Sequence, residues 1–169
     1  EFAPGDEVIV TGYDLGMNTF GGLADYIRVP ASWLIKRPVG LGLREAMILG
    51  TAGFTAGLCV HKLLRAGIQP SDGDIVVTGA TGGVGSVAVK LLSQLGYRVV
   101  AATGKAEEGP FLQQLGAAEV IDRALLTEGA NKPMLKSRWA GAVDTVGGEI
   151  LFNVIKSLNY GGSVACCGL

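Results

Sequence analysis

The feature that most constrains this fold is a glycine-rich turn, Thr78-Gly79-Ala80-Thr81-Gly82-Gly83-Val84-Gly85, set between two apolar patterns. The run Ile75-Val76-Val77 before it has the composition of a buried parallel strand. After it, apolar residues recur at helical spacing from Val84 to Leu95. Glycines permit a tight turn and close approach of a phosphate, and the helix start offers free N–H groups and a positive dipole end. The turn therefore predicts a nucleotide-binding βα unit, the alternative being a tight turn without a ligand.

The register of the glycine motif stays open. Two spacings fit, G-x-x-G-x-x-G at Gly79, Gly82 and Gly85, and G-x-G-x-x-A at Gly83, Gly85 and Ala88. The Thr78-Gly79 start also resembles the short-chain dehydrogenases, whose catalytic tyrosine is followed four residues later by a lysine. None of the four tyrosines in this chain has that lysine. The short-chain interpretation therefore lacks its catalytic pair within this sequence.

Strands and helices alternate along the chain from the turn onward. The patterns predict strands at 98–102, 119–121, 140–146 and 163–167, and helices at 84–95, 111–115 and 150–158. Upstream they predict strands at 8–10 and 24–29 and a helix at 44–66. This alternation indicates an α/β fold with a doubly wound parallel sheet of the Rossmann kind.

Composition excludes several classes of function. The net charge is −1 and no basic stretch is present, which argues against nucleic-acid binding. No apolar run reaches the roughly 18 residues of a membrane span, and no signal peptide opens the chain. Three cysteines, Cys59, Cys166 and Cys167, and the single His61 give neither a disulfide framework nor zinc-ligand spacing. We expect a metal-free protein in a reducing, cytoplasmic compartment.

The end of the second predicted strand of the unit indicates which dinucleotide is bound. An acidic residue there would bind the ribose hydroxyls of NAD and repel a 2′-phosphate. This strand ends instead in Thr103-Gly104-Lys105, and Arg123 follows the next strand. A hydroxyl and two cations suit a phosphate, whereas solvated surface charge is the alternative interpretation of Lys105 and Arg123. The pattern favours NADP(H).

Four stretches resemble one family: Gly21-Gly22-Leu23-Ala24, Gly50 to Ala56, Thr78 to Gly85, and Asn159-Tyr160-Gly161-Gly162 running to Leu169. Together with Ala140 to Gly147 they are similar to the medium-chain dehydrogenase/reductase superfamily, in its zinc-free quinone oxidoreductase branch. Within that branch the resemblance is to the acrylyl-CoA reductase (YhdH/AcuI) type. It implies NADPH-dependent reduction of the activated double bond of a small enoyl thioester. A quinone or enone reductase, and a non-catalytic NADPH-binding module, are the alternatives.

The resemblance also implies roles for individual residues. Thr81, Gly82, Gly83 and Val84 would hold the pyrophosphate; Thr103, Gly104 and Lys105 would hold the 2′-phosphate with Arg123 nearby; Thr51, Gly168 and Leu169 would lie near the nicotinamide. The family more often has Ser-Gly-Arg where this chain has Thr-Gly-Lys, a change that is expected to weaken the hold on the phosphate. For Thr51 the alternative role is a helix N-cap. No catalytic residue is assigned.

The resemblance further implies how the chain is organised. Residues 1–36 would be a remnant of a GroES-like catalytic β-barrel, and residues 37–169 an incomplete NADP-binding Rossmann domain that lacks its last strand. The chain then appears as a fragment, inactive alone, of a parent enzyme that acts on a small molecule. A homodimer is expected for the parent from the family alone.

Overall fold

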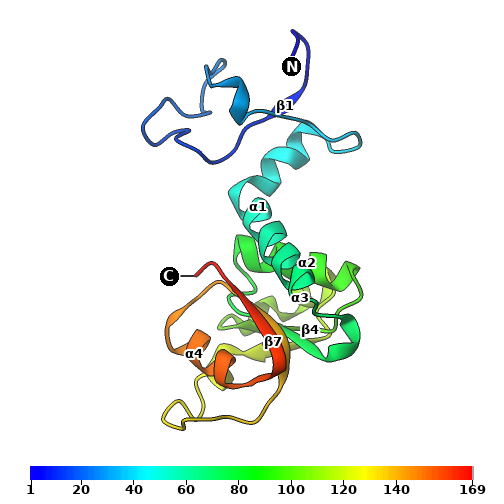
Figure 1. Cartoon of the computed structure of the whole chain (residues 1–169), viewed down its shortest axis with the longest axis vertical. Coiled ribbons are helices and arrows are strands. Elements are labelled where there is room, and N and C mark those ends of the chain that lie inside the picture. Colours follow the sequence, from blue (N-terminus) through cyan, green and yellow to red (C-terminus); the bar gives the residue numbers. More distant parts are fainter. Residues whose placement is uncertain (169) are drawn as a thin grey trace. The chain divides into compact units, whose positions relative to one another are not determined.

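The computed structural model describes residues 1–168, and the chain divides into two compact units at Thr51/Ala52. The helices are α1 Leu43–Arg65, α2 Gly83–Gln94, α3 Gly109–Leu115 and α4 Gly148–Lys156, with short 3-10 turns η1 Ala31–Trp33, η2 Pro70–Asp72, η3 Ala106–Glu108 and η4 Arg123–Leu126. The strands are β1 Val8–Ile9, β2 Ile35–Lys36, β3 Asp74–Val77, β4 Val99–Thr103, β5 Glu119–Asp122, β6 Trp139–Asp144 and β7 Leu158–Cys166 (Figure 1). The predicted boundary at 36/37 between a barrel remnant and a Rossmann domain stays a prediction.

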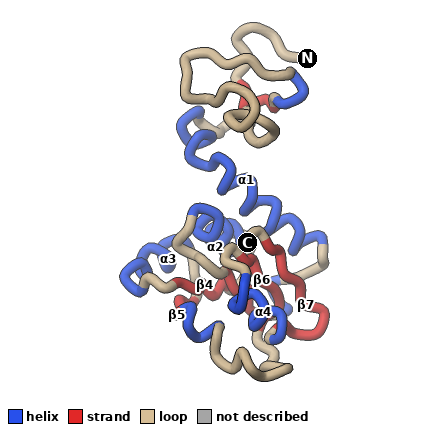
Figure 2. The backbone as a smooth tube through the Cα atoms, turned by 90° about the vertical axis from the view of Figure 1, so that its left-hand side faces the viewer, coloured by secondary structure: helices blue, strands red, loops and turns tan. Residues whose placement is uncertain are grey.

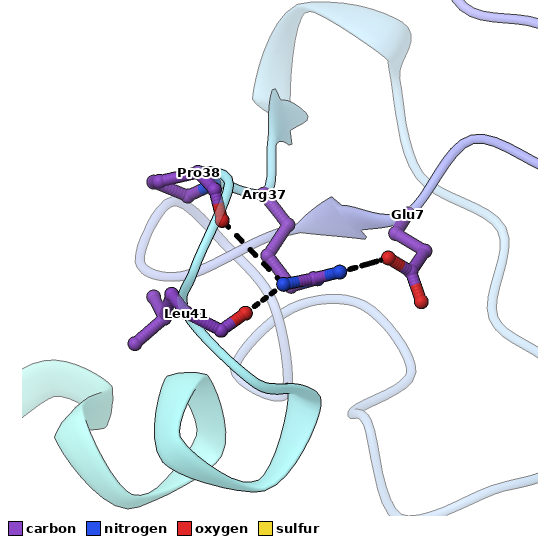
Figure 3. Close-up of polar contacts among 4 residues, drawn as sticks. All are labelled: Glu7, Arg37, Pro38 and Leu41. Atoms are coloured by element: carbon purple, nitrogen blue, oxygen red, sulfur yellow. Dashed lines mark hydrogen bonds and ion pairs between the residues drawn. The ribbon is translucent and has the colours of Figure 1, made fainter.

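The smaller unit is mostly loop around one short antiparallel pair, in which Val8 of β1 faces Lys36 of β2. Arg37, directly after β2, closes this pair. Its guanidinium donates to the Glu7 carboxylate and to the carbonyl oxygens of Leu41 and, at 3.4 Å, Pro38 (Figure 3). One arginine therefore ties the start of β1 to the segment that leads into α1.

The strand predicted at 24–29 is wrong. These residues form a loop, and Tyr26 is 93% exposed. The strand of this region is the two-residue β2, which the apolar pattern did not predict. A strand exists only where its backbone has a partner. Within residues 1–168 the 24–29 segment pairs with no strand, whereas Ile35 lies opposite Ile9.

Helix α1 is interrupted at Gly50, which has φ 47° and ψ −150° and so lies outside the helical region. The predicted helix at 44–66 is confirmed, and the predicted stop is confirmed at Gly67, whose φ is 86°. Among residues 1–168, α1 is the helix long and apolar enough to cross a membrane by length and composition. Its buried residues, Ala56, Cys59, Val60 and Leu63, belong to the core of the larger unit.

The larger unit is built on a five-stranded parallel sheet in the order β5-β4-β3-β6-β7 (Figure 2). The chain moves outward from β3 through β4 to β5, returns to the other side of β3 at β6, and ends at β7. This reversal between β3 and β6 is the mark of a doubly wound fold. The predicted α/β class is thus confirmed.

Residues of β3 alternate between two hydrophobic layers. Ile75 and Val77 pack with α1, α2 and α3, whereas Val76 packs on the opposite face with Val154 of α4. Both faces of the sheet are therefore covered, which explains why these strands read as continuous apolar runs. The two hydrophobic layers thus hold the sheet between α1, α2 and α3 on one face and α4 on the other.

Strand β7 begins earlier than predicted, at Leu158 rather than 163, and α4 ends at Lys156. Leu158 pairs with Trp139, but Gly141 pairs with Ser163, so the intervening residues bulge from the ladder. Gly161 in this bulge has φ 79°. The apolar pattern did not predict the first half of the strand, because the bulged residues do not alternate between two faces.

Candidate nucleotide-binding site

The candidate site lies at the carboxyl ends of β3, β4 and β6, where the strand order reverses. In open parallel sheets a crevice forms at this point because the loops that follow neighbouring strands diverge to opposite faces. Here the diverging loops begin at Thr78 after β3 and Thr145 after β6. The fold therefore places the glycine turn at the edge where such sheets bind ligands.

The glycine turn is held tightly between β3 and α2. Gly79 adopts φ 58°, and its carbonyl accepts the N–H of Gly82 at 2.9 Å. A Cβ on Gly85 would lie 2.8 Å from the Cα of Ala80, so this position has no room for a side chain. Helix α2 begins at Gly83 without a side-chain cap. The amides of its first turn have no helical acceptor and are available to an anion.

A cavity of about 260 Å³ opens beside this turn. Its walls come from the loop after β3, the end of β4, the start of η4 and the start of α4, namely Thr78, Gly79, Thr81, Ala102, Thr103, Gly104, Lys105, Arg123, Leu126, Val146 and Ile150. The structure thus brings together Thr81, Thr103, Gly104, Lys105 and Arg123. None of the lining residues is acidic.

Thr103 organises the polar side of the cavity. Its hydroxyl accepts the backbone N–H of Lys105 at 3.0 Å and lies 3.3 Å from the hydroxyl of Thr81. Thr103 is buried, whereas Lys105 is exposed. The threonine therefore shapes the turn that presents the lysine to the cavity.

Two cations flank Gly104. A Cβ on Gly104 would lie 2.8 Å from Nε of Arg123, so the arginine side chain lies directly over the glycine. The adjacent Asp122 carboxylate is engaged as a cap, since it accepts the N–H of Ala124 at 2.8 Å. Within the described chain neither Lys105 nor Arg123 forms an ion pair. Their charge is thus available to an anionic group.

Sequence reasoning missed the buried polar pair beneath the cavity. The Thr78 hydroxyl donates to Oδ1 of Asp144 at 2.7 Å, and both side chains are almost fully buried. The sequence signal was that Thr78 follows one apolar strand and that Asp144 lies toward the end of another. That signal places each at the sheet edge but does not show that they meet.

The other predicted site residues are placed as follows. Gly82 precedes α2, and Gly83 and Val84 begin it. Gly168 donates its N–H to the Asp144 carbonyl at 3.2 Å, so it lies at the same sheet edge. Thr51 belongs to the smaller unit, and Leu169 lies outside the described residues.

Among residues 1–168, no group of three or more His, Cys, Asp or Glu side chains is placed so that it could hold a metal ion. Burial raises the pKa of the Cys59 thiol to about 11, with a further contribution from Cys167 beside it. A thiol that resists ionisation is a poor metal ligand and a poor nucleophile.

Comparisons with known proteins agree with this geometry. The family model described as zinc-binding dehydrogenase matches residues 83–169. The "Probable acrylyl-CoA reductase AcuI" of Escherichia coli (strain K12) is 53% identical over 168 residues, which cover 99% of this chain and 51% of that protein. The chain spans about half the length of the curated relatives it matches.

Two solved structures show the same fold with a nucleotide bound. The yhdH oxidoreductase from Salmonella enterica in complex with NADP has a TM-score of 0.95 and 52% identity. The yhfP protein of Bacillus subtilis with NAD bound has a TM-score of 0.97 and 52% identity. Each match covers 99% of this chain and 51% of the other.

Proposed function

Because this chain belongs to the zinc-binding dehydrogenase family, in the medium-chain branch of the YhdH/AcuI acrylyl-CoA reductases and the YhfP quinone oxidoreductases, we propose that it forms the NADPH-binding part of an enoyl-thioester reductase. The reaction would reduce the activated carbon–carbon double bond of a small acrylyl-CoA-like substrate. The observation that carries the cofactor choice is the cavity at the end of β4, where Thr103, Lys105 and Arg123 converge without an acidic neighbour in its wall.

The residues of this cavity have separable roles in the proposal. Lys105 and Arg123 attract the 2′-phosphate, and the Thr103 hydroxyl holds the turn that carries Lys105. Lys105 acts as a point charge rather than a planar fork, so its contribution is attraction more than orientation. An aspartate or glutamate in the same place would instead favour NADH.

The pyrophosphate would lie at the glycine turn. Thr81, Gly82, Gly83 and Val84 form the proposed cradle, in which the uncapped start of α2 supplies backbone donors and the positive end of its dipole. We keep Thr51, Gly168 and Leu169 as proposed neighbours of the nicotinamide ring, on the family resemblance alone.

When bound, NADPH supplies the hydride for the reduction. The described residues contribute binding and orientation, and no step of the proposal uses a metal, on the resemblance to the zinc-free branch. The hydrogen-bond donors that stabilise the developing negative charge on the thioester carbonyl are expected outside this chain.

A homodimer and a reducing cytoplasmic compartment belong to the same proposal. The compartment is in keeping with the three free cysteines.

The test is a fluorescence titration of the full-length protein with NADPH and NADH, for the unmodified protein and for Lys105→Ala. We expect a preference for NADPH that Lys105→Ala removes and that rising salt weakens, because the exposed cations are screened. Equal binding of both dinucleotides by the unmodified protein would reject the 2′-phosphate site.

Substrate class is tested separately by turnover of acrylyl-CoA against a panel of quinones and simple enones. Turnover of the thioester supports the proposal. Turnover of quinones alone assigns the protein to the other activity of its branch. Tight NADPH binding with no hydride transfer to any acceptor would identify a non-catalytic binding module.

A further inference from the structure

Asp144 is a buried carboxylate that connects several loops of the site. It is the last residue of β6 and is fully buried. Its Oδ1 accepts the hydroxyl of Thr78 at 2.7 Å, and its Oδ2 accepts the N–H of Gly147 at 2.8 Å. One side chain thus connects the end of β3 with the turn between β6 and α4.

Thr78 completes the connection from the opposite side. Its hydroxyl also accepts the N–H of Thr145 at 3.0 Å, and its carbonyl accepts the hydroxyl of Thr145 at 2.9 Å. The backbone carbonyl of Asp144 accepts the N–H groups of Cys167 at 2.9 Å and Gly168 at 3.2 Å. The ends of β3, β6 and β7 are therefore tied at one point.

The loops that meet at Thr78 and Asp144 are closely packed against one another. A Cβ on Gly79 would meet the hydroxyl of Thr145 and come within 3.1 Å of a Val146 methyl group. A Cβ on Gly168 would lie 2.7 Å from the carbonyl carbon of Val146. Gly79 and Val146 both line the cavity, so the connection sets the shape of its wall.

No cation accompanies this carboxylate within the described residues, where none of the ion pairs includes Asp144. Burying a carboxyl group costs free energy that burying an apolar side chain of similar size would not. Hydrogen bonds to Thr78 and Gly147 offset that cost only in one arrangement of the loops. The Asp144 side chain therefore favours one arrangement of these loops more than it stabilises the fold.

We propose that Asp144 and Thr78 are positioning residues for the nucleotide site, an inference that rests on the proposed function. Neither residue is given a chemical step. They hold the glycine turn, the 145–147 turn and the segment after β7 in the register that a dinucleotide needs. Their influence is on the pyrophosphate side of the site, so it applies to NADPH and NADH alike.

The experiment uses Thr78→Val, which keeps the shape of the side chain but removes the hydroxyl, and Thr78→Ser, which keeps the hydroxyl. NADPH and NADH are the probes, with affinities measured by nicotinamide fluorescence in the full-length protein. Thr78→Val is expected to weaken both dinucleotides by about tenfold, leaving their affinity ratio unchanged, and Thr78→Ser is expected to restore most of the affinity. Lys105→Ala, in contrast, changes the ratio.

Amide hydrogen exchange supplies a readout that needs no nucleotide. In Thr78→Val we expect faster exchange confined to residues 145–147, where Thr145 and Gly147 donate to the pair, and to residues 79–83, the glycine turn that directly follows Thr78. If exchange instead rises uniformly through the sheet and both affinities are unaltered, Thr78 and Asp144 serve only the stability of the fold, and the inference is overturned. No dinucleotide binding by the unmodified protein would reject the proposed function and with it the nucleotide role of the pair, whereas binding by the unmodified protein with both affinities unaltered in Thr78→Val would reject the inference alone.

Discussion

The hydroxyl of Thr81, in the loop after β3, lies 3.3 Å from the hydroxyl of Thr103, the last residue of β4. This contact joins the glycine turn to the turn that carries Lys105. The proposed pyrophosphate and 2′-phosphate subsites therefore share a wall, and changes on either side of it are expected to have distinguishable effects.

Thr103→Val should weaken NADPH binding more than NADH binding. The substitution keeps the buried volume but removes the acceptor of the Lys105 N–H, which loosens the turn. A lost hydrogen bond of this kind costs about 1 kcal/mol, which is roughly fivefold in affinity. Fluorescence titration measures the effect, and Thr103→Ser, which keeps the acceptor, is the matched control. An equal loss in both variants would contradict this role of the hydroxyl.

Gly104→Ala should reduce the preference for NADPH without unfolding the protein. The new methyl group would occupy the space of the Arg123 side chain, whose Nε lies 2.8 Å from the Cβ position. A flexible arginine can move aside, but its charge then leaves the cavity. We expect a loss of about threefold to tenfold in NADPH affinity and little change for NADH.

The control for that change is Gly109→Ala, at the first residue of α3, where a Cβ would meet nothing within 4 Å. It should leave both affinities as they are. A matching loss in the control would mean that the effect at Gly104 does not depend on Arg123.

Gly85→Ala and Gly57→Ala should change stability in opposite directions. At Gly85 the added methyl group would lie 2.8 Å from the Cα of Ala80, which is backbone and cannot move aside, so we expect a loss of about 3 kcal/mol. At Gly57, inside α1, it would meet nothing within 4 Å, and better helix propensity should add about 0.5–1 kcal/mol. Urea unfolding of both variants measures the two changes, and equal effects would contradict the packing argument.

Cys59 should resist alkylation at neutral pH. Burial, with a smaller contribution from Cys167, raises the pKa of its thiol to about 11, so about one thiol in a thousand is ionised at pH 8. Labelling with iodoacetamide, followed by mass spectrometry, should show a rate at Cys59 that rises about tenfold per pH unit. A rate at pH 8 equal to that in urea would contradict the burial of this thiol.

The same raised pKa predicts that the folded protein loses stability as the pH rises into the alkaline range. The folded protein holds the Cys59 proton more tightly than the unfolded chain does. The stabilising contribution is therefore complete below about pH 8.5, the usual thiol value, and is lost as the pH rises toward 11.

Much of the larger unit could be predicted from its sequence because the signals are local. Buried parallel strands read as apolar runs, and Gly67, Gly96 and Gly116 end their helices with positive φ angles. The meeting of Thr103, Lys105 and Arg123 at one cavity was predictable for a related reason. Thr103 ends one strand, Lys105 follows it and Arg123 follows the neighbouring strand, and parallel strands bring their carboxyl ends to one edge.

What the sequence alone determined was thus the class of fold, the glycine turn and the composition of the sheet edge that carries the candidate site. Only the tertiary structure decided that residues 24–29 form no strand, that β7 begins with a bulge, and that Thr78 meets Asp144 across 66 positions of the chain. Each of these depends on a partner brought close by the order β5-β4-β3-β6-β7. A hydrogen bond needs two groups within about 3 Å, and periodicity along the chain carries no information about which distant groups satisfy that condition.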